Sequence, residues 1–340
     1  MDILLDIQDL VVHYKIKTGW VHACDGVSLQ LQRGETIGLV GESACGKTTL
    51  AYAISQLLPN NAYIKGGRVV FNGQNLLAIT MRKDGRLKEY EPALNKIRWK
   101  EISMIFQGAM NALNPVQPVG DQIIEAIVYH EKTNKQGARK WVEHLYELVG
   151  IPKDRIDNYP HEYSGGMKQR AMIAMALALG PKLVIADEPT TALDVITQSK
   201  ILGRIRELQE KLSMAMIIIT HDVSVVAKTA ERIAVMYAGQ IGEIGTTRQI
   251  FKETAHPYTS GLLGSFPSVK GKVRRLTTIS GNPPSLVEPP SGCRFHPRCP
   301  YAQDICKQQM PPAIAVGVNH LSYCHFAKDL QGKLSPEVIG

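Results

Sequence analysis

The chain has 340 residues, of which 44% are hydrophobic and 21% charged, a composition typical of a globular protein with one large domain and a smaller one. No apolar run approaches the roughly 20 residues that a membrane-spanning helix needs, and residues 1–6 lack the basic start of a signal peptide, so we expect a cytosolic chain. The net charge of +8 suits nucleic acid, anionic lipid headgroups, nucleotide or a solvated basic surface, and it excludes none of them.

Strands and helices alternate along most of the chain. Short β-like runs bounded by turn residues lie at 10–14, 27–31, 36–40, 68–71, 102–106, 183–187 and 214–220. Helical patterns lie at 50–58, 120–131, 136–149, 165–179 and 195–212. The order predicts an α/β nucleotide-binding core that a helical insertion interrupts at about 108–180.

The residues that follow the strand at 36–40 fit the phosphate-binding pattern G-x-x-x-x-G-K-[ST]. A strand that ends in such a loop turns successive N–H groups toward one point, and the helix start adds its positive dipole end. We expect Lys47 to reach the outer phosphates of a nucleotide and the Thr48 hydroxyl to bind a bridging Mg²⁺. A chance glycine-rich turn is the alternative. The nucleotide-binding residues of this loop are Gly41, Glu42, Ser43, Ala44, Cys45, Gly46, Lys47, Thr48 and Thr49.

A second element of phosphate chemistry is the apolar run 183–186, which closes with Asp187 and Glu188. An aspartate at a strand end beside a phosphate loop holds Mg²⁺, directly or through water. Glu188 would then lie beside the γ-phosphate and polarise an attacking water as a general base. Such acidic pairs are also common on surfaces, but the apolar strand and the upstream loop favour the catalytic interpretation.

Residues 163–170 lead into an apolar helix. Ser164 can cap this helix, and Gly165 and Gly166 allow backbone N–H groups to approach an anion closely. Taken alone, the segment favours a plain helix cap with flexible glycines. The order of motifs along the whole chain favours a functional role instead.

That order resembles the ATPase subunit of an ATP-binding-cassette (ABC) transporter over about residues 4–250. The motifs are the phosphate loop, Gln107 after a strand, Ser164-Gly165-Gly166, Asp187-Glu188, the run 191–194, and His221 after a strand. The resemblance implies a P-loop NTPase core with an antiparallel β subdomain and a helical insertion. It also implies binding and hydrolysis of ATP with Mg²⁺, which Thr48, Gln107 and Asp187 would ligate.

Further roles follow from the same resemblance. Tyr14 would stack on adenine, for which an ordinary strand aromatic is the alternative. Gln107 would contact Mg²⁺ and the attacking water, and His221 would hydrogen-bond the γ-phosphate. Two such domains would close head-to-tail around two ATP molecules, with Asp194 at their interface. Residues 164–166 would contact the γ-phosphate of the ATP that the opposite subunit holds.

Two residues depart from the usual motifs of this family. Ala44 stands where Gly or Asn is more usual, and a positive φ there would cost about 1 kcal/mol. Tyr163 stands where Leu or Phe is more usual, and we expect it to pack similarly. We expect both to be tolerated variants.

A narrower resemblance covers nearly the full chain. Residues 111–115, 256–259 and 293–300 look like the oligopeptide/dipeptide (and nickel) importer branch, in which an extension follows the ATPase core. The chain would then divide into a nucleotide-binding domain at 1–255 and an extension at 256–340. Proline-rich residues 281–290 favour a small, loop-rich extension that a metal centre holds in shape.

Four cysteines lie in this extension, and five, six and seventeen residues separate them. A disulfide framework is disfavoured in a cytosolic chain, so the four predict metal binding. Four thiolates suit tetrahedral zinc or an iron–sulfur cluster, and the spacing does not choose between them. The resemblance implies a 4Fe–4S cluster of structural role, with Zn²⁺ as the alternative. The four are Cys293, Cys299, Cys306 and Cys324.

Basic residues flank these cysteines. Arg294, His296 and Arg298 could offset the charge of the thiolates, or they could belong to a solvated basic surface together with Lys270 and Lys272.

The leading interpretation is an ATPase subunit that energises the import of di- and oligopeptides at the cytoplasmic face of the inner membrane, as a peripheral protein. The resemblance implies three kinds of partner: a second, homologous ATPase as a heterodimer, two transmembrane permease subunits, and an extracytoplasmic solute-binding protein. The same role in a nickel or oligosaccharide importer is an alternative, because this subunit would never touch the substrate. A soluble ABC ATPase acting on nucleic acid is disfavoured, since such proteins often carry two cassettes or a long coiled coil. A redox-sensing regulator is the third class.

Overall fold

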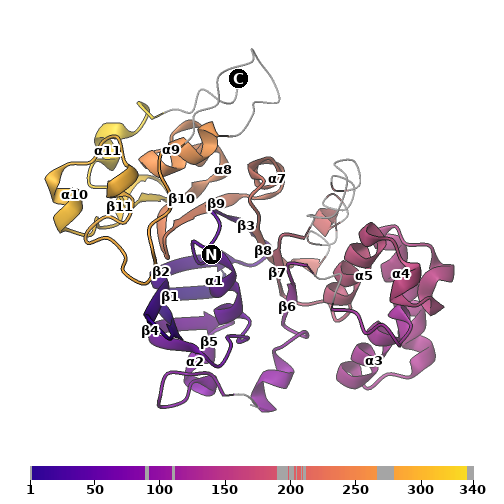
Figure 1. Ribbon diagram of the computed structural model, residues 1–340. Helices are drawn as coiled ribbons and strands as arrows, with labels where there is room; N and C mark the ends of the chain where they lie inside the picture. The colour runs from indigo at the N-terminus through magenta and orange to yellow at the C-terminus, as the bar shows by residue number, and fades with distance from the viewer. Residues whose placement is uncertain are drawn as a thin grey trace.

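Two β-sheets form the centre of the molecule, with helices on either side (Figure 1). The computed structural model describes residues 2–88, 92–108, 112–189, 198, 203, 205–207, 209, 212–265 and 279–334. No helix in these ranges is both long and apolar enough to cross a membrane.

The smaller sheet is antiparallel, in the order β2-β1-β4-β5. Its strands are β1 (Ile3–Ile16), β2 (Gly19–Gln32), β4 (Ala62–Phe71) and β5 (Gln74–Asn75). The larger sheet has the order β11-β12-β10-β9-β3-β8-β7-β6, and its centre from β9 to β6 is parallel. Its strands are β3 (Thr36–Val40), β6 (Ile102–Ile105), β7 (Leu183–Asp187), β8 (Ala215–Ile219), β9 (Arg232–Tyr237), β10 (Gln240–Thr246), β11 (Ile314–Gly317) and β12 (His320–Ser322).

The central strands are short and almost wholly apolar because both of their faces are covered. Every residue of β3, β7 and β8 is buried. One face of the large sheet packs on the antiparallel sheet, in a core that includes Leu39, Ile185 and Ile217. The other face packs on the helices, in a core that includes Val40 and Ile218. This double burial fixes the strand ends from which the functional loops start.

Helices flank both sheets. Their bounds are α1 (Lys47–Ile54), α2 (Leu76–Thr80), α3 (Val119–Glu131), α4 (Lys135–Val149), α5 (Gly165–Leu177), α7 (Val223–Thr229), α8 (Thr247–Lys252), α9 (Pro257–Gly264), α10 (Asp304–Gln308) and α11 (Ala327–Leu330). Short 3₁₀ turns lie at Pro92–Lys96, Lys153–Asp157, Pro160–Glu162 and His296–Arg298.

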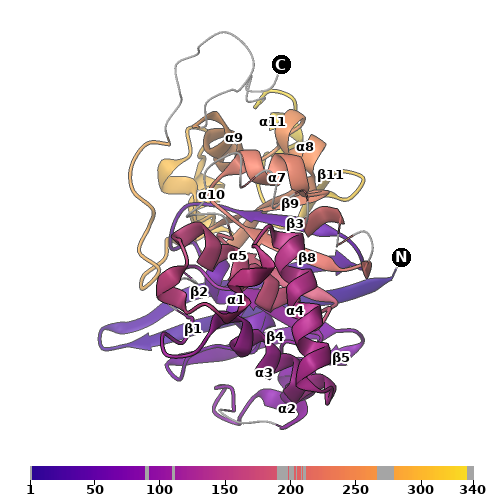
Figure 2. The ribbon, with the colours of Figure 1, turned by 90° about the vertical axis from the view of Figure 1, so that its right-hand side faces the viewer.

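Helices α3, α4 and α5 form the helical insertion, which faces the viewer in Figure 2. The sequence of α4 explains why this segment of the insertion is helical. Asn134 caps its start by accepting a hydrogen bond from the Gly137 N–H at 2.8 Å, and Gly150 ends it in the left-handed region at φ 72°. Buried residues such as Val142 and Tyr146, one turn apart, give the helix its apolar face.

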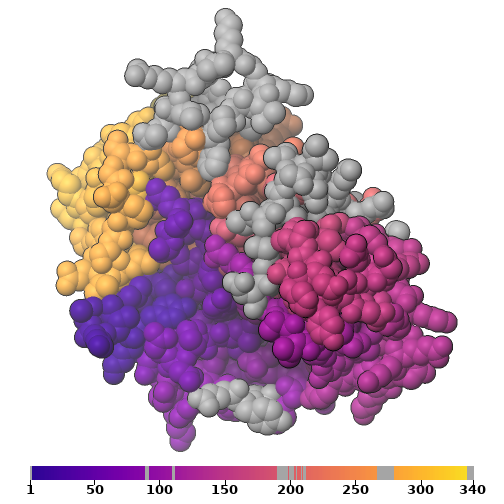
Figure 3. Space-filling model, turned by 45° about the vertical axis from the view of Figure 1, so that its right-hand side comes forward, coloured from indigo at the N-terminus to yellow at the C-terminus, as the bar shows by residue number. Residues whose placement is uncertain are grey.

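The C-terminal extension continues the large sheet. Strand β12 pairs antiparallel with β10, and β11 pairs with β12. Between β10 and β12, His320 Nε2 lies 2.8 Å from Glu243 Oε1, and both side chains are fully buried. Figure 3 shows the extension, in yellow and orange, on the opposite side of the molecule from the magenta helical insertion. A domain boundary at 255 stays a prediction, and the sheet crosses it.

The predicted α/β fold, with a P-loop core, an antiparallel β subdomain and a helical insertion, is confirmed. Several predicted elements have different bounds; the strands predicted at 27–31 and 68–71, for example, extend over Gly19–Gln32 and Ala62–Phe71. The helix predicted at 50–58 begins at Lys47 and ends at Ile54, because Gln56 adopts a positive φ of 60° and stops it. The strand predicted at 10–14 extends over Ile3–Ile16, because it pairs on both edges with long neighbours. Most of the helix predicted at 195–212 lies outside the described residues.

Candidate nucleotide site

The phosphate loop connects β3 to α1 and depends on two glycines. A Cβ atom at Gly41 would lie 2.1 Å from the carbonyl oxygen of Met236, and one at Gly46 would lie 2.0 Å from that of Ala23. Both glycines also have positive φ angles, of 154° and 106°. Ala44 has a φ of 61°, so the strained conformation anticipated at this departure from the usual motif is present.

The lysine and the threonine of the loop have separate partners. Lys47 Nζ donates to the carbonyl oxygens of Gly41 and Glu42, each at 2.8 Å, so its ammonium lies over the loop. Thr48 Oγ1 donates to Asp187 Oδ2 at 2.8 Å. Asp187 is 2% exposed at the end of β7, and this burial raises the pKa of its carboxyl group. Two of the three predicted Mg²⁺ ligands, Thr48 and Asp187, are therefore in contact, and a cation would favour the ionised carboxylate.

Three predicted catalytic side chains meet at the ends of neighbouring strands. Gln107 Nε2 donates to Glu188 Oε2 at 3.0 Å, and His221 Nδ1 lies 3.0 Å from Glu188 Oε1. The side chain of Glu188 is 18% exposed and that of His221 is 69% exposed, so water reaches the cluster. Glu188 has a positive φ of 50°, and its N–H donates to the carbonyl oxygen of Ile219. A carboxylate that two groups orient and that remains open to water suits a general base.

A cavity of about 410 Å³ lies beside the phosphate loop. Tyr14 is part of its wall, and the Tyr14 hydroxyl lies 3.2 Å from Thr49 Oγ1. All residues from Glu42 to Thr49 line the same cavity. Tyr14 thus lies at the cavity of the phosphate loop, and its stacking on adenine stays a prediction.

The helix-capping motif lies elsewhere. Ser164 caps α5 by accepting a hydrogen bond from the Met167 N–H at 3.3 Å, as the sequence predicts. Ser164 and Gly165 are exposed, Gly166 is partly exposed, and none of the three lines the cavity beside the phosphate loop. Tyr163 is buried, and its hydroxyl pairs with that of Tyr146 at 3.0 Å. The predicted interface residue Asp194 lies outside the described residues.

The four predicted cysteine ligands come together in the extension. Cys293, Cys299, Cys306 and Cys324 line one small cavity with aromatic residues that include Phe295 and Phe326. Burial raises the pKa of the Cys299 thiol to about 11 and that of Cys324 to about 12. Burial also raises the pKa of the Cys293 thiol. Backbone N–H groups, such as that of Tyr301 toward Cys299, point at these sulfurs and favour thiolates.

Sequence reasoning missed that the extension reaches the nucleotide site. Pro283, Pro284 and Leu286 line the cavity beside the phosphate loop. Arg298 binds Glu42 with both ends of its guanidinium group, at 2.7 and 3.0 Å, and these hydrogen bonds raise the pKa of the arginine. The alternative of a solvated surface is wrong for Arg298 and Arg294, whose side chains are 6% and 5% exposed. The sequence signal for this contact was the positive charge of Arg298 next to a cysteine. It did not identify Glu42 as the partner, because Glu42 lies far from Arg298 along the chain.

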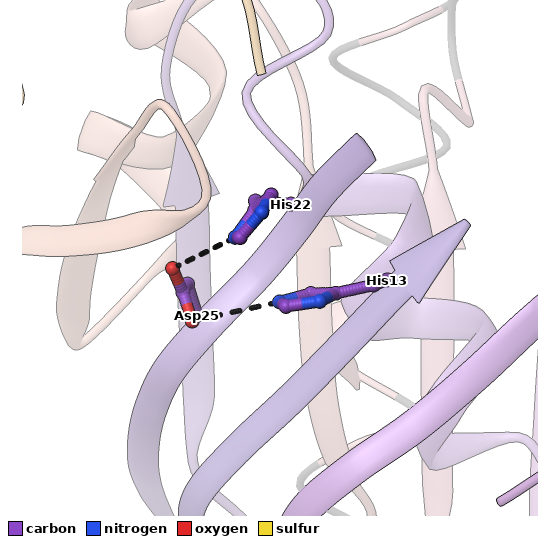
Figure 4. A group of neighbouring side chains, drawn as sticks. All are labelled: His13, His22 and Asp25. Carbon is purple, nitrogen blue, oxygen red and sulfur yellow. Dashed lines mark hydrogen bonds and ion pairs between the residues drawn. The ribbon is translucent and has the colours of Figure 1, made fainter. Parts of the chain in front are cut away.

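One further group of possible metal ligands lies outside the predicted site. The ligand atoms of His13, His22 and Asp25 all lie within 4.8 Å of one another, and both imidazoles point to the carboxylate of Asp25 (Figure 4). Arg294 donates to the same Oδ2 atom that His22 approaches. Because a guanidinium already neutralises this carboxylate, we interpret the group as the anchor of Arg294 and not as a cation site.

Comparison with known proteins agrees with this geometry. Residues 24–191 match the family model described as ABC transporter, and residues 243–306 match the one described as oligopeptide/dipeptide transporter, C-terminal region. The chain is 46% identical to the oligopeptide transport ATP-binding protein OppD of Bacillus subtilis, over 93% of this chain and 87% of the relative. It is also 46% identical to the dipeptide transport ATP-binding protein DppD of that organism, over 95% of each.

A solved structure extends the comparison to three dimensions. The dimeric, post-hydrolysis state of the ATP-binding cassette MJ0796, bound to ADP and Pi, superposes with a TM-score of 0.63 at 25% identity. The match covers 72% of this chain and 99% of that one. The chain therefore belongs to the ABC transporter ATPases, in the family whose members carry the oligopeptide/dipeptide transporter C-terminal region.

Proposed function

We propose that this ABC ATPase binds and hydrolyses MgATP with its predicted site residues and so energises peptide import. The observation that supports this most is the meeting of two groups at the carboxyl ends of adjacent parallel strands. One group is Thr48 with Asp187, which would hold Mg²⁺. The other is Glu188 with Gln107 and His221, which would orient and activate the attacking water. Lys47 would leave its two carbonyl partners and bind the outer phosphates.

The site is incomplete without a second ATPase. The motif at 164–166 is exposed or partly exposed and does not line the cavity of its own chain, as a contact to a nucleotide on another subunit requires. A dimeric relative of the same fold supports this assembly. We propose a head-to-tail heterodimer with a homologous ATPase, in which ATP closes the interface and hydrolysis releases it.

A groove between the core and the helical insertion supports contact with a permease. It has a volume of about 300 Å³, and its apolar wall includes Trp99, Phe106, Met172 and Met175. Phe106 precedes Gln107, so a partner seated in the groove would touch the strand end that bears this catalytic side chain. We propose that the permease subunits dock there, which places the protein peripherally at the cytoplasmic face of the inner membrane.

Peptides are the proposed cargo, because relatives of high identity over most of the chain are named for oligopeptide and dipeptide transport. An extracytoplasmic solute-binding protein would select them. A nickel or oligosaccharide importer remains the alternative, since no residue described above would meet the cargo.

We propose that the four cysteines hold a 4Fe–4S cluster. Their shared cavity, low exposure and backbone N–H partners suit a tetrathiolate centre. Around one zinc ion, with Zn–S bonds of about 2.3 Å, thiolates would lie about 3.8 Å apart. Among the described residues, no three cysteine sulfurs lie within 4.8 Å of one another. In a cluster each thiolate would bind a different iron atom, and Zn²⁺ held by the four thiolates is the alternative.

The test is purification of the complex from membrane extract, followed by ATP hydrolysis with and without peptide-loaded binding protein. We expect permease subunits and a homologous ATPase to co-purify, and peptide to stimulate phosphate release. Lys47→Ala should abolish both ATP binding and transport. Stimulation by RNA, and not by peptide, would favour the nucleic-acid class instead.

A further inference from the structure

The loop at residues 293–299, which runs from the first to the second cysteine of the extension, hydrogen-bonds to the phosphate loop. Arg298 Nη1 and Nη2 donate to the two carboxylate oxygens of Glu42 at 2.7 and 3.0 Å. Nη1 also reaches the Tyr237 hydroxyl at 3.2 Å, and Nε donates to the Ser280 carbonyl oxygen at 2.9 Å. Such a forked pair fixes the orientation of the carboxylate as well as its position. Glu42 is the second residue of the phosphate loop, so the extension contacts this loop directly.

The backbone of Glu42 is held as well. Its N–H donates to the Tyr258 hydroxyl at 2.9 Å. The ring of Tyr258 packs against Phe295 at 5.4 Å and against Tyr237 at 4.5 Å, measured between ring centroids. Phe295 lies between the two arginines of the same loop and is 3% exposed. The aromatic cluster therefore holds the main chain of Glu42 through Tyr258, and its Tyr237 hydroxyl also contacts Arg298, which holds the side chain of Glu42.

A second arginine anchors the other end of this loop. Arg294 is 5% exposed and donates to the carboxylate of Asp25 and to the carbonyl oxygen of Ala238. Ala238 lines the cavity beside the phosphate loop. Its neighbour Gly239 donates to the carbonyl oxygen of Cys45, inside the phosphate loop, at 2.8 Å. The cysteine loop thus contacts the phosphate loop directly at Glu42 and indirectly, through Ala238 and Gly239, at Cys45.

We propose that Arg298 is a positioning residue for nucleotide binding, and that it transmits the state of the cysteine centre to the phosphate loop. This inference rests on the proposed ATPase function. Cys293 and Cys299 bracket the loop that bears Arg298, so loss of their common centre frees the guanidinium group from Glu42. The phosphate loop then loses its preorganisation, and ATP binds more weakly while Glu188 and its partners are unchanged.

The measurement is equilibrium binding of trinitrophenyl-ATP, with Mg²⁺, to the purified full-length chain. Arg298→Gln and Glu42→Gln should each raise Kd by about tenfold, as expected for loss of a charge-assisted pair. The double variant should bind no more weakly than either single one, because both remove the same contact. Cys299→Ser should raise Kd similarly, with no further change when it is combined with Arg298→Gln. Lys307→Gln, which breaks an exposed ion pair in the same extension, is the matched control and should keep the parental Kd.

In the assembled transporter, Arg298→Gln should raise KM for ATP and leave kcat within about twofold, because the catalytic groups keep their places. Unchanged Kd in Arg298→Gln, or single effects that multiply in the double variant, would overturn the proposal. If Arg298→Gln does not fold, Arg298→Lys tests the proposal instead, because lysine keeps the positive charge but cannot form the two-pronged contact with Glu42. Its Kd should lie between the parental value and the tenfold higher value. Lys47→Ala reports on the proposed ATPase function separately: parental binding by that variant would overturn the function and not only the positioning role.

Discussion

Replacing Glu188 with Gln removes the proposed base with almost no change of shape. In the parental protein, Glu188 Oε2 accepts from Gln107 Nε2 and Oε1 faces His221 Nδ1, both at 3.0 Å. A glutamine keeps one acceptor, and the amide of Gln107 can turn to satisfy the new N–H group. We therefore expect the free energy of unfolding to change by no more than about 1 kcal/mol.

Catalysis should respond far more strongly. A positioned general base contributes about 10²–10⁴-fold. Phosphate release from the assembled transporter should fall by this factor, which corresponds to about 3–5 kcal/mol of barrier. Trinitrophenyl-ATP should still bind, because Lys47, Thr48 and Asp187 are unchanged. Glu147→Gln on α4, which breaks an exposed ion pair with Lys153, is the control and should keep the parental rate. A parental rate of phosphate release in Glu188→Gln would refute its role as the base.

Three other predictions concern the stacking of the nucleotide base on Tyr14, the stability of the protein at acid pH and the cysteine centre. Tyr14→Ala should weaken trinitrophenyl-ATP binding by about 1–3 kcal/mol, whereas Tyr14→Phe should bind normally, because stacking needs the ring and not the hydroxyl. Burial lowers the pKa of His256 to about 4, from an ordinary value of 6.5. The unfolded chain therefore binds the extra proton first, and about 3 kcal/mol of stability that is present at pH 7 should be lost as pH falls through 6.5 to 4. His256→Asn keeps an acceptor for the Tyr258 N–H. The urea midpoint of this variant should depend less on pH than that of the parental protein. An unchanged dependence of the midpoint on pH would show that His256 is not the titrating group. Cys324→Ser should abolish the visible iron–sulfur absorption band, and full retention of iron and sulfide would exclude this ligand.

The local motifs could be predicted from the sequence because each depends on residue types and spacings within a few positions. The glycines and the lysine of the phosphate loop stand at fixed spacing after an apolar strand, and that spacing alone predicts the turn that the structure contains. The strand 36–40 agrees with β3 at both ends. The strain at Ala44 could also be anticipated, since only the backbone geometry of the motif was needed.

Contacts between remote segments could not be read in this way. The charges of Arg298 and Glu42 are visible in the sequence, but 256 positions separate them and no periodicity connects them. The same is true of His320, which meets Glu243 only because β12 joins the edge of the large sheet. Spacing and periodicity thus determined the nucleotide loop, the acidic strand end and the cysteine set. Only the tertiary structure decided which surface the extension covers, because packing of distant chain segments depends on the folded path and not on neighbouring residues.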